Sequence, residues 1–516
     1  MTGPETAAVR LNPRRIALGG ILLVAAVFAY GYFFTEGLPW FWHDDVDRIQ
    51  RVERTDWPEL VRQTFDFASP NFGTERPVLQ MFVKLSLALF GEYAHAHRMF
   101  KLAIFCGALA VLYLLLVRNR VRWGIAAGGL LLAATWPSVM IVTSWAYEAA
   151  AIELFFKVCA LALFFFLMRR EGSCSNPGTI AACALLLLLV ILADHAKATA
   201  KILPAVFLAT LVLCGSRRPH LYVVSLLALA AVFPYSVLLG HGAPPVSGGS
   251  FLPRLLANFG RQGGWVAAAL LLGVAASRFR NLPGDPLLRL LFCWWVFEMA
   301  FCAVYPSGEL RYLYSSLIAF TTFASAAISF LLETMRERSV RWVTVAACGL
   351  LSLAALGFNT RWNDSFRGSW GSFLVLTDKK MQYVNSHYRN SIFLYLDFNL
   401  LFYQRKTTNV YANINPVNSW GRKFYDVILP IGDSIHVRDG FEHVLLDGFV
   451  PYKYQDPIAM FYGVVDGSLW DWVHQRYELD LRRAHMHDLN LNDREDYPII
   501  GGVSEVKGNR IDLVVH

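Results

Sequence analysis

The chain has 516 residues, of which 55% are hydrophobic and only 17% are charged, and its formal net charge is +8. Soluble globular proteins average about a quarter charged residues, so this composition excludes an ordinary soluble enzyme and favours a polytopic α-helical membrane protein. The positive charge does not predict nucleic-acid binding, because membrane proteins concentrate Arg and Lys in their cytoplasmic loops. We therefore expect a membrane and no nucleic acid among its partners.

The first apolar run, from Ile16 to Phe34, predicts an uncleaved transmembrane helix. Three arginines precede it and no small-residue cleavage motif follows it, which argues against a signal peptide. The polar stretch 35–97 that follows is the first outer loop. Within this loop, Val78–Gly91 is apolar but short and contains Lys84, which predicts an interfacial or re-entrant helix.

Ten more apolar runs follow, so we predict about eleven transmembrane helices in a domain spanning residues 1–358. The dense Arg clusters between the runs fall on one side, which the positive-inside rule assigns to the cytoplasm together with the N-terminus. The odd count places the C-terminus on the outer face. The compact loops and the cysteine-free tail favour a bacterial inner-membrane protein whose tail is periplasmic. The ten runs are 98–117, 123–142, 150–168, 178–193, 203–214, 221–240, 264–277, 288–305, 312–332 and 340–358.

The tail, residues 359–516, has frequent charges and is long enough for one soluble domain. Segments rich in Val, Ile, Leu and Phe predict strands in it, and one segment predicts a helix. We therefore expect a small α/β domain on the outer face. The predicted strands are Ser391–Phe398, Asp426–Ile431, Phe441–Val450 and Arg510–Val515, and the predicted helix is Leu469–Ala484.

Ionisable residues near the membrane gather in the outer loops. Asp44 and Asp45 directly follow the first helix, and Lys197, Lys201 and Arg311 lie in later outer loops, against the positive-inside trend. Ionisable groups close to hydrocarbon are costly and are usually paired or functional. A carboxylate can act as a general base, while Arg and Lys suit a phosphate. Together they indicate group transfer from a lipid-phosphate carrier.

Four motifs in this order resemble the GT-C superfamily of polyprenyl-phosphate-sugar-dependent glycosyltransferases, most closely its protein O-mannosyltransferase-like and aminoarabinose-transferase-like branch. The resemblance covers about residues 1–358, and the tail matches no family. The motifs are Asp44-Asp45, Glu75-Arg76-Pro77-Val78, the segment Ala196–Pro204, and Glu309-Leu310-Arg311-Tyr312.

The resemblance implies an inverting glycosyltransferase that moves a sugar from a polyprenyl-phosphate donor to a glycan, lipid or protein acceptor on the outer face. Asp44 is the implied base, and Asp45 supports it or binds a divalent metal with it. Lys197 and Arg311 hold the donor phosphate. Lys201 is the alternative to Lys197, because Ala196 and Ala198 stand where the family has Ser and Glu beside its lysine. Arg76 supports the acidic loop; Glu75, Glu148, Glu309 and Tyr312 complete the implied site.

Simpler interpretations of the same residues remain open. The two aspartates can cap a helix or face solvent in a loop, and either lysine can extend toward lipid headgroups. Arg76 can pair with Glu75, and Arg311 can pair with Glu309.

Two other functions also remain open for the whole chain. A transporter or flippase of lipid-linked sugars needs charged or broken helices at mid-membrane; the sequence offers Glu153 and Lys157 as a buried pair and Glu298 as a lone acid. A non-catalytic scaffold whose outer domain binds a partner is the second alternative.

Overall fold

The structure, a computed structural model, describes part of the chain. The described residues are 13–36, 48–49, 52, 55–66, 76–91, 93–144, 146–170, 176–233, 253, 255–256, 285–304, 313–334, most of 339–365, and six strands between 391 and 512. The chain divides into a helical unit, Met1–Glu36 with Val52–Arg367, and a second unit, Gly37–Arg51 with Gly368–His516. The predicted boundary after residue 358 stays a prediction.

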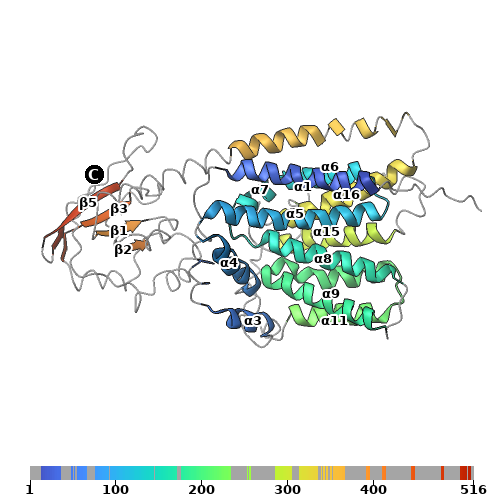
Figure 1. Ribbon diagram of the computed structural model, residues 1–516, viewed down its shortest axis with the longest axis horizontal. Helices are drawn as coiled ribbons and strands as arrows, with labels where there is room; N and C mark the ends of the chain where they lie inside the picture. Colours follow the sequence, from blue (N-terminus) through green and yellow to red (C-terminus); the bar gives the residue numbers. More distant parts are fainter. Residues whose placement is uncertain are drawn as a thin grey trace, which may run out of the picture. The chain divides into compact units, whose positions relative to one another are not determined.

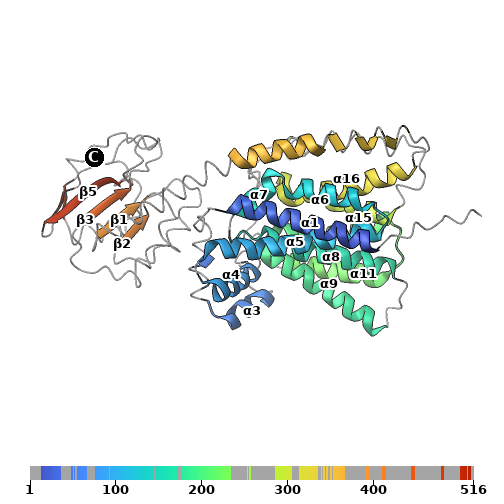
Figure 2. The same ribbon diagram turned by 45° about the horizontal axis from the view of Figure 1, so that its top comes forward.

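The helical unit consists of long helices that run side by side, with α3 and α4 together at one end (Figures 1 and 2). Its elements are α1 (Pro13–Thr35), α3 (Trp57–Phe65), α4 (Pro77–Phe90), α5 (Ala94–Arg118), α6 (Trp123–Ala134), α7 (Pro137–Ser144), α8 (Ala150–Arg169), α9 (Pro177–Ala196), the short 3₁₀ helix η1 (Ala198–Ile202), α10 (Leu203–Leu213), α11 (Pro219–Val232), α15 (Pro286–Val304) and α16 (Tyr314–Thr334).

Among the described helices, α1, α5, α8, α9, α15 and α16 are long and apolar enough to cross a membrane, judged by length and composition. They coincide with six of the predicted spans and support an integral membrane protein. The count of eleven stays a prediction, because 264–277 lies outside the described residues and 340–358 is described only in part. Residues 77–90 form α4, the short apolar helix expected in the first outer loop.

The prediction of one helix over residues 123–142 is wrong. Helix α6 ends at Ala134, and α7 begins at Pro137. Proline has no N–H and disfavours helical geometry in the residue before it, so the segment breaks here. The side-chain amide of Asn363 donates to the carbonyl of Thr135 at 2.9 Å, which satisfies a backbone acceptor beside the break.

Helix α8 lies within the core of the helical unit, where it packs against α5 and α9. It also contacts α10, where the ring of Phe207 stacks on that of Phe164 with the ring centres 4.3 Å apart. Two charged residues of α8, Glu153 and Lys157, are fully buried in the same core. The packing of α8 therefore places ionised groups where they need partners from other helices.

The second unit contains a six-stranded mixed sheet in the order β2-β1-β3-β5-β6-β4. β1 pairs in parallel with β2 and β3, β5 pairs antiparallel with β3 and β6, and β4 pairs in parallel with β6. The strands are β1 (Ser391–Tyr395), β2 (Val410–Asn413), β3 (His443–Asp447), β4 (Glu478–Asp480), β5 (Ile500–Lys507) and β6 (Arg510–Asp512).

Three predicted strands of the tail correspond to β1, β3 and β6, while β2, β4 and β5 were not predicted. The helix expected over Leu469–Ala484 is wrong at residues 478–480, which form β4. The predicted strand Asp426–Ile431 lies outside the described residues. The sheet pairing of β4 with β6 overrides a local pattern that favoured a helix.

Candidate functional site

Four of the ten predicted site residues belong to the described part of the chain: Arg76, Glu148, Lys197 and Lys201. The other six lie outside it, and their roles stay predictions; they are Asp44, Asp45, Glu75, Glu309, Arg311 and Tyr312.

Lys197 lies at an interruption between two helices. It is the C-cap of α9, with extended backbone angles of φ −159° and ψ 134°, and η1 begins at the next residue. The chain resumes a regular helix at Leu203, with Pro204 in the first turn of α10, where a proline costs no hydrogen bond. The interruption directs the Lys197 side chain away from the helix surface and into the unit, where its side chain is only 5% exposed.

The Lys197 ammonium has an acidic and an aromatic neighbour. Its Nζ donates to Oε1 of Glu148 at 2.7 Å, and it lies 5.0 Å from the centre of the Tyr314 ring. Glu148 is in the turn before α8, and its side chain is also 5% exposed. Cation–π contact and a charge-assisted hydrogen bond both favour the protonated lysine.

Arg76 is a second cation of this region. It is the N-cap of α4 and has left-handed backbone angles of φ 52° and ψ 57°, a conformation uncommon outside glycine. Burial lowers the pKa of Lys197 below its ordinary value, Glu148 opposes this shift, and the charge of Arg76 adds to it. Lys197 is therefore a cation whose charge depends on its carboxylate neighbour.

Lys201 has a different set of partners, although it is only four residues away. Its Nζ donates to Oδ2 of Asp194 at 3.0 Å and to the carbonyl of Val232 at 2.7 Å. It also lies 5.7 Å from the centre of the Phe233 ring, and its side chain is 18% exposed. Of the two lysines that the motif left open, Lys197 is the one whose charge is coupled to Glu148 and Arg76.

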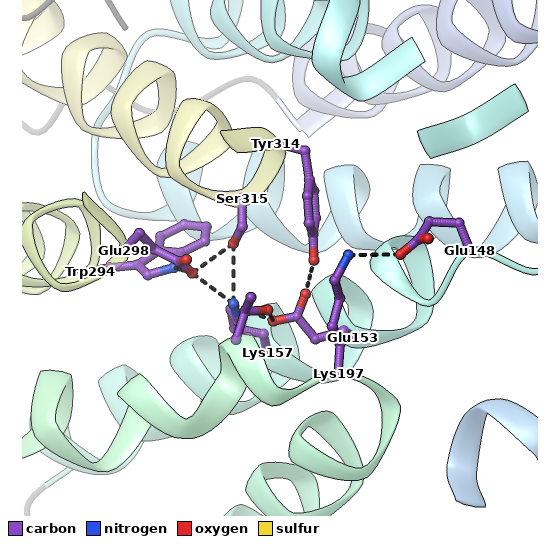
Figure 3. Close-up of polar contacts among 9 residues, drawn as sticks. Glu148, Glu153, Lys157, Lys197, Trp294, Glu298, Tyr314 and Ser315 are labelled. Atoms are coloured by element: carbon purple, nitrogen blue, oxygen red, sulfur yellow. Dashed lines mark hydrogen bonds and ion pairs between the residues drawn. The ribbon is translucent and has the colours of Figure 1, made fainter. Parts of the chain in front are cut away.

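A buried charge cluster, defined here as Glu153, Lys157 and Glu298, was underestimated from sequence. Lys157 forms ion pairs with Glu153, four residues earlier in α8, and with Glu298 of α15, the latter at 2.7 Å. Figure 3 shows the three charges meeting between the helices. The interpretation of Glu298 as a lone acid is wrong, since its partner is 141 residues away in the sequence.

The buried charge cluster is also linked to uncharged donors. Glu298 accepts from Ser315 Oγ at 2.6 Å and from Trp294 Nε1 at 3.0 Å. Glu153 accepts from Thr199 Oγ1 at 2.6 Å and from the Tyr314 hydroxyl. Ion pairs in a low-dielectric interior are tolerated when their remaining hydrogen-bonding positions are satisfied.

The arrangement suits recognition of an anion with several oxygens, such as a phosphate. Lys197 supplies a buried ammonium, Arg76 adds a second positive charge to its surroundings, and the Tyr314 ring forms a wall beside the ammonium. No group of three or more His, Cys, Asp or Glu side chains able to hold a metal occurs among the described residues. The metal considered at Asp44 and Asp45 concerns residues outside that part of the chain.

No protein-family model matches the sequence, and no curated protein matches it significantly. The structure is similar to ArnT from Cupriavidus metallidurans bound to undecaprenyl phosphate, with 16% identity over 77% of this chain and 86% of that chain and a TM-score of 0.46. It is also similar to the oligosaccharyltransferase AglB from Archaeoglobus fulgidus in complex with an inhibitory peptide and a dolichol-phosphate. That match has 12% identity over 82% of this chain and 69% of that chain, with a TM-score of 0.47.

Both solved structures hold a lipid phosphate, undecaprenyl phosphate in ArnT and dolichol-phosphate in AglB. At these identities and TM-scores, the likeness assigns no activity to this chain.

Proposed function

We propose that the protein is an integral-membrane inverting glycosyltransferase that moves a sugar from a polyprenyl-phosphate carrier to an acceptor on the outer face of the membrane. The buried Lys197 side chain, whose Nζ lies 2.7 Å from Oε1 of Glu148, is the observation that supports it most strongly. Buried cations at the end of a membrane-length helix are costly, and a lipid phosphate is a ligand that repays this cost.

In the proposed reaction, the donor phosphate binds at Lys197, assisted by Arg76 and by Arg311. The acceptor oxygen attacks the anomeric carbon while Asp44 accepts its proton. The bond between the anomeric carbon and the phosphate oxygen breaks, and the carrier phosphate leaves with the bonding electrons. The cations stabilise the negative charge that develops on the leaving phosphate. Asp45 supports Asp44 or binds a divalent metal with it.

Release of the free carrier phosphate from the sugar donor is the measurement that tests the proposal. Purified full-length protein is reconstituted with undecaprenyl-phosphate-linked pentoses and hexoses and with a membrane extract that supplies acceptors, and free undecaprenyl phosphate is measured by mass spectrometry. The wild type releases it from at least one donor, and Asp44→Asn releases none. Asp47→Asn, a neutralisation in the same loop, is the matched control and retains release. Near-normal release by Asp44→Asn contradicts the proposed base.

A second candidate, a transporter or flippase of lipid-linked sugars, is favoured by two observations. The segment expected to span the membrane at 123–142 is broken before Pro137, and the buried charge cluster lies inside membrane-length helices. Broken helices and intramembrane charges are features of transporters. Movement of a lipid-linked sugar across vesicles, unchanged in Asp44→Asn and without release of the carrier phosphate, supports this candidate over the transferase.

A further inference from the structure

The buried charge cluster has no direct part in the proposed reaction, yet it is expensive to bury. Glu153, Lys157 and Glu298 are at most 1% exposed, so two carboxyl groups share one lysine in the core. Buried ion pairs are often no more stable than apolar residues of similar volume. Stability alone therefore gives a weak reason for these residues.

Each donor proton of Lys157 in the cluster has a hydrogen-bond acceptor. Lys157 Nζ donates to Ser315 Oγ at 3.1 Å, in addition to its two carboxylate partners, so its three protons each have an acceptor. Ser315 in turn donates to Glu298. The orientation of the Glu153 carboxylate is determined by Lys157 and Thr199, which both bind its Oε1, and by the Tyr314 hydroxyl, which donates to its Oε2.

Thr199 and Tyr314 both lie next to Lys197. Thr199 is two residues after Lys197 within η1, the turn that fixes the Lys197 backbone. The Tyr314 ring lies 5.0 Å from the Lys197 ammonium, and Figure 3 shows the Tyr314 hydroxyl aimed at Glu153 with the Lys197 side chain beside the ring. One carboxylate thus holds the backbone turn and the aromatic wall of the same lysine.

We propose that the buried charge cluster is a positioning unit for Lys197, in which Glu153 fixes the η1 turn through Thr199 and the aromatic wall through Tyr314. The inference rests on the proposed function, because it treats Lys197 as the phosphate ligand. Glu153, Thr199 and Tyr314 are positioning residues in this account. Lys157 and Glu298 act one step further away by orienting the Glu153 carboxylate.

The first test measures Lys197 itself, so it does not depend on a correct donor. Full-length protein is labelled with a trace of acetic anhydride, and acetylation of Lys197 and Lys201 is quantified by mass spectrometry across pH. Tyr314→Phe and Thr199→Val each remove one hydroxyl that donates to Glu153. We expect either change to alter Lys197 labelling by about tenfold, the order expected for losing one hydrogen bond to a charged group.

Two controls separate positioning from general loosening of the fold. Lys201 bonds to Asp194 and Val232 instead of to Glu153, Lys157 or Glu298, so its labelling stays within about twofold as an internal reference. Tyr113→Phe removes the hydroxyl of another tyrosine that is 1% exposed, but this hydroxyl donates at 3.0 Å to the carbonyl of Ile16. This variant leaves Lys197 labelling unchanged.

The second test uses binding of undecaprenyl phosphate. If Thr199 and Tyr314 act through the Glu153 carboxylate, the double variant Tyr314→Phe with Thr199→Val raises the Kd no more than Glu153→Gln does. Independent action would instead raise the Kd by the product of the two single-variant increases. Failure of the wild type to bind this lipid, with Lys197 labelling still altered in the variants, refutes the proposed function and keeps the positioning unit. The positioning unit is refuted if both hydroxyl variants keep Lys197 labelling and lipid binding within twofold of the wild type.

Discussion

Replacing Lys197 by methionine tests the candidate phosphate site most stringently. Methionine has a similar length and no charge, so it removes the ammonium 2.7 Å from the Glu148 carboxylate while filling much of the same space. Both side chains are only 5% exposed, and breaking a buried pair by removing one partner costs about 3–5 kcal/mol. We therefore expect Lys197→Met to lower the stability of the helical unit as well as its affinity for a lipid phosphate.

The two effects separate in a double variant. Lys197→Met with Glu148→Gln removes both charges, so stability recovers most of the loss. Affinity for undecaprenyl phosphate does not recover, because one hydrogen bond to a charged group contributes about 1.5–3 kcal/mol, or roughly 10- to 150-fold in Kd.

Native mass spectrometry of the detergent-solubilised protein gives the Kd, and thermal unfolding gives the stability. Lys201→Met is the matched control, since Lys201 bonds to Asp194 and Val232 instead of Glu148; it is expected to change the Kd less than about threefold. Wild-type affinity in the Lys197→Met, Glu148→Gln double variant, or a larger loss in Lys201→Met, refutes the assignment of the phosphate to Lys197.

Three further predictions concern charge and backbone bonds. Lys197 binds phosphate as the ammonium, so phosphate binding is present below the pKa of Lys197 and is lost as the pH rises through that pKa. Because Glu148 raises the pKa of Lys197, Glu148→Gln moves the alkaline loss of binding to lower pH. A midpoint at the same or a higher pH in this variant contradicts the prediction. Lys157→Met leaves two buried carboxylates without their shared cation and lowers stability by about 3–5 kcal/mol in thermal unfolding, whereas a loss below about 1 kcal/mol opposes the account. Asn363→Leu removes the bond to the Thr135 carbonyl beside the helix break and costs about 1–3 kcal/mol without changing lipid affinity; a large change in affinity argues against a purely structural role for Asn363.

The helices were predictable where a single physical requirement decides them. Continuous apolar runs near 20 residues long predict α1, α5 and α9, because crossing hydrocarbon needs that length and internal satisfaction of the backbone. The break between α6 and α7 also has a local signal, Pro137, which hydropathy averaging conceals. A proline inside an otherwise apolar run was the observation that could have divided this span.

The site was less predictable because its geometry depends on contacts between distant segments. The motif could not choose between Lys197 and Lys201; the structure separates them because η1 interrupts the helix and gives the two side chains different partners. The pairing of Lys157 with Glu298 joins α8 to α15, and no sequence period connects residues so far apart. In the sheet unit, β4 has three residues, too few to show an alternating pattern.

Identification of the lipid that copurifies with the protein shows whether Lys197 holds a lipid phosphate. Full-length wild type and the double variant Lys197→Met with Glu148→Gln are purified in parallel from the same membranes, and bound lipids are extracted and identified by mass spectrometry. The account predicts a polyprenyl phosphate, free or sugar-linked, in the wild type and its loss from the double variant. Equal amounts of that lipid in both proteins, or a wild type that carries only bulk phospholipids, contradicts a lipid-phosphate site at Lys197.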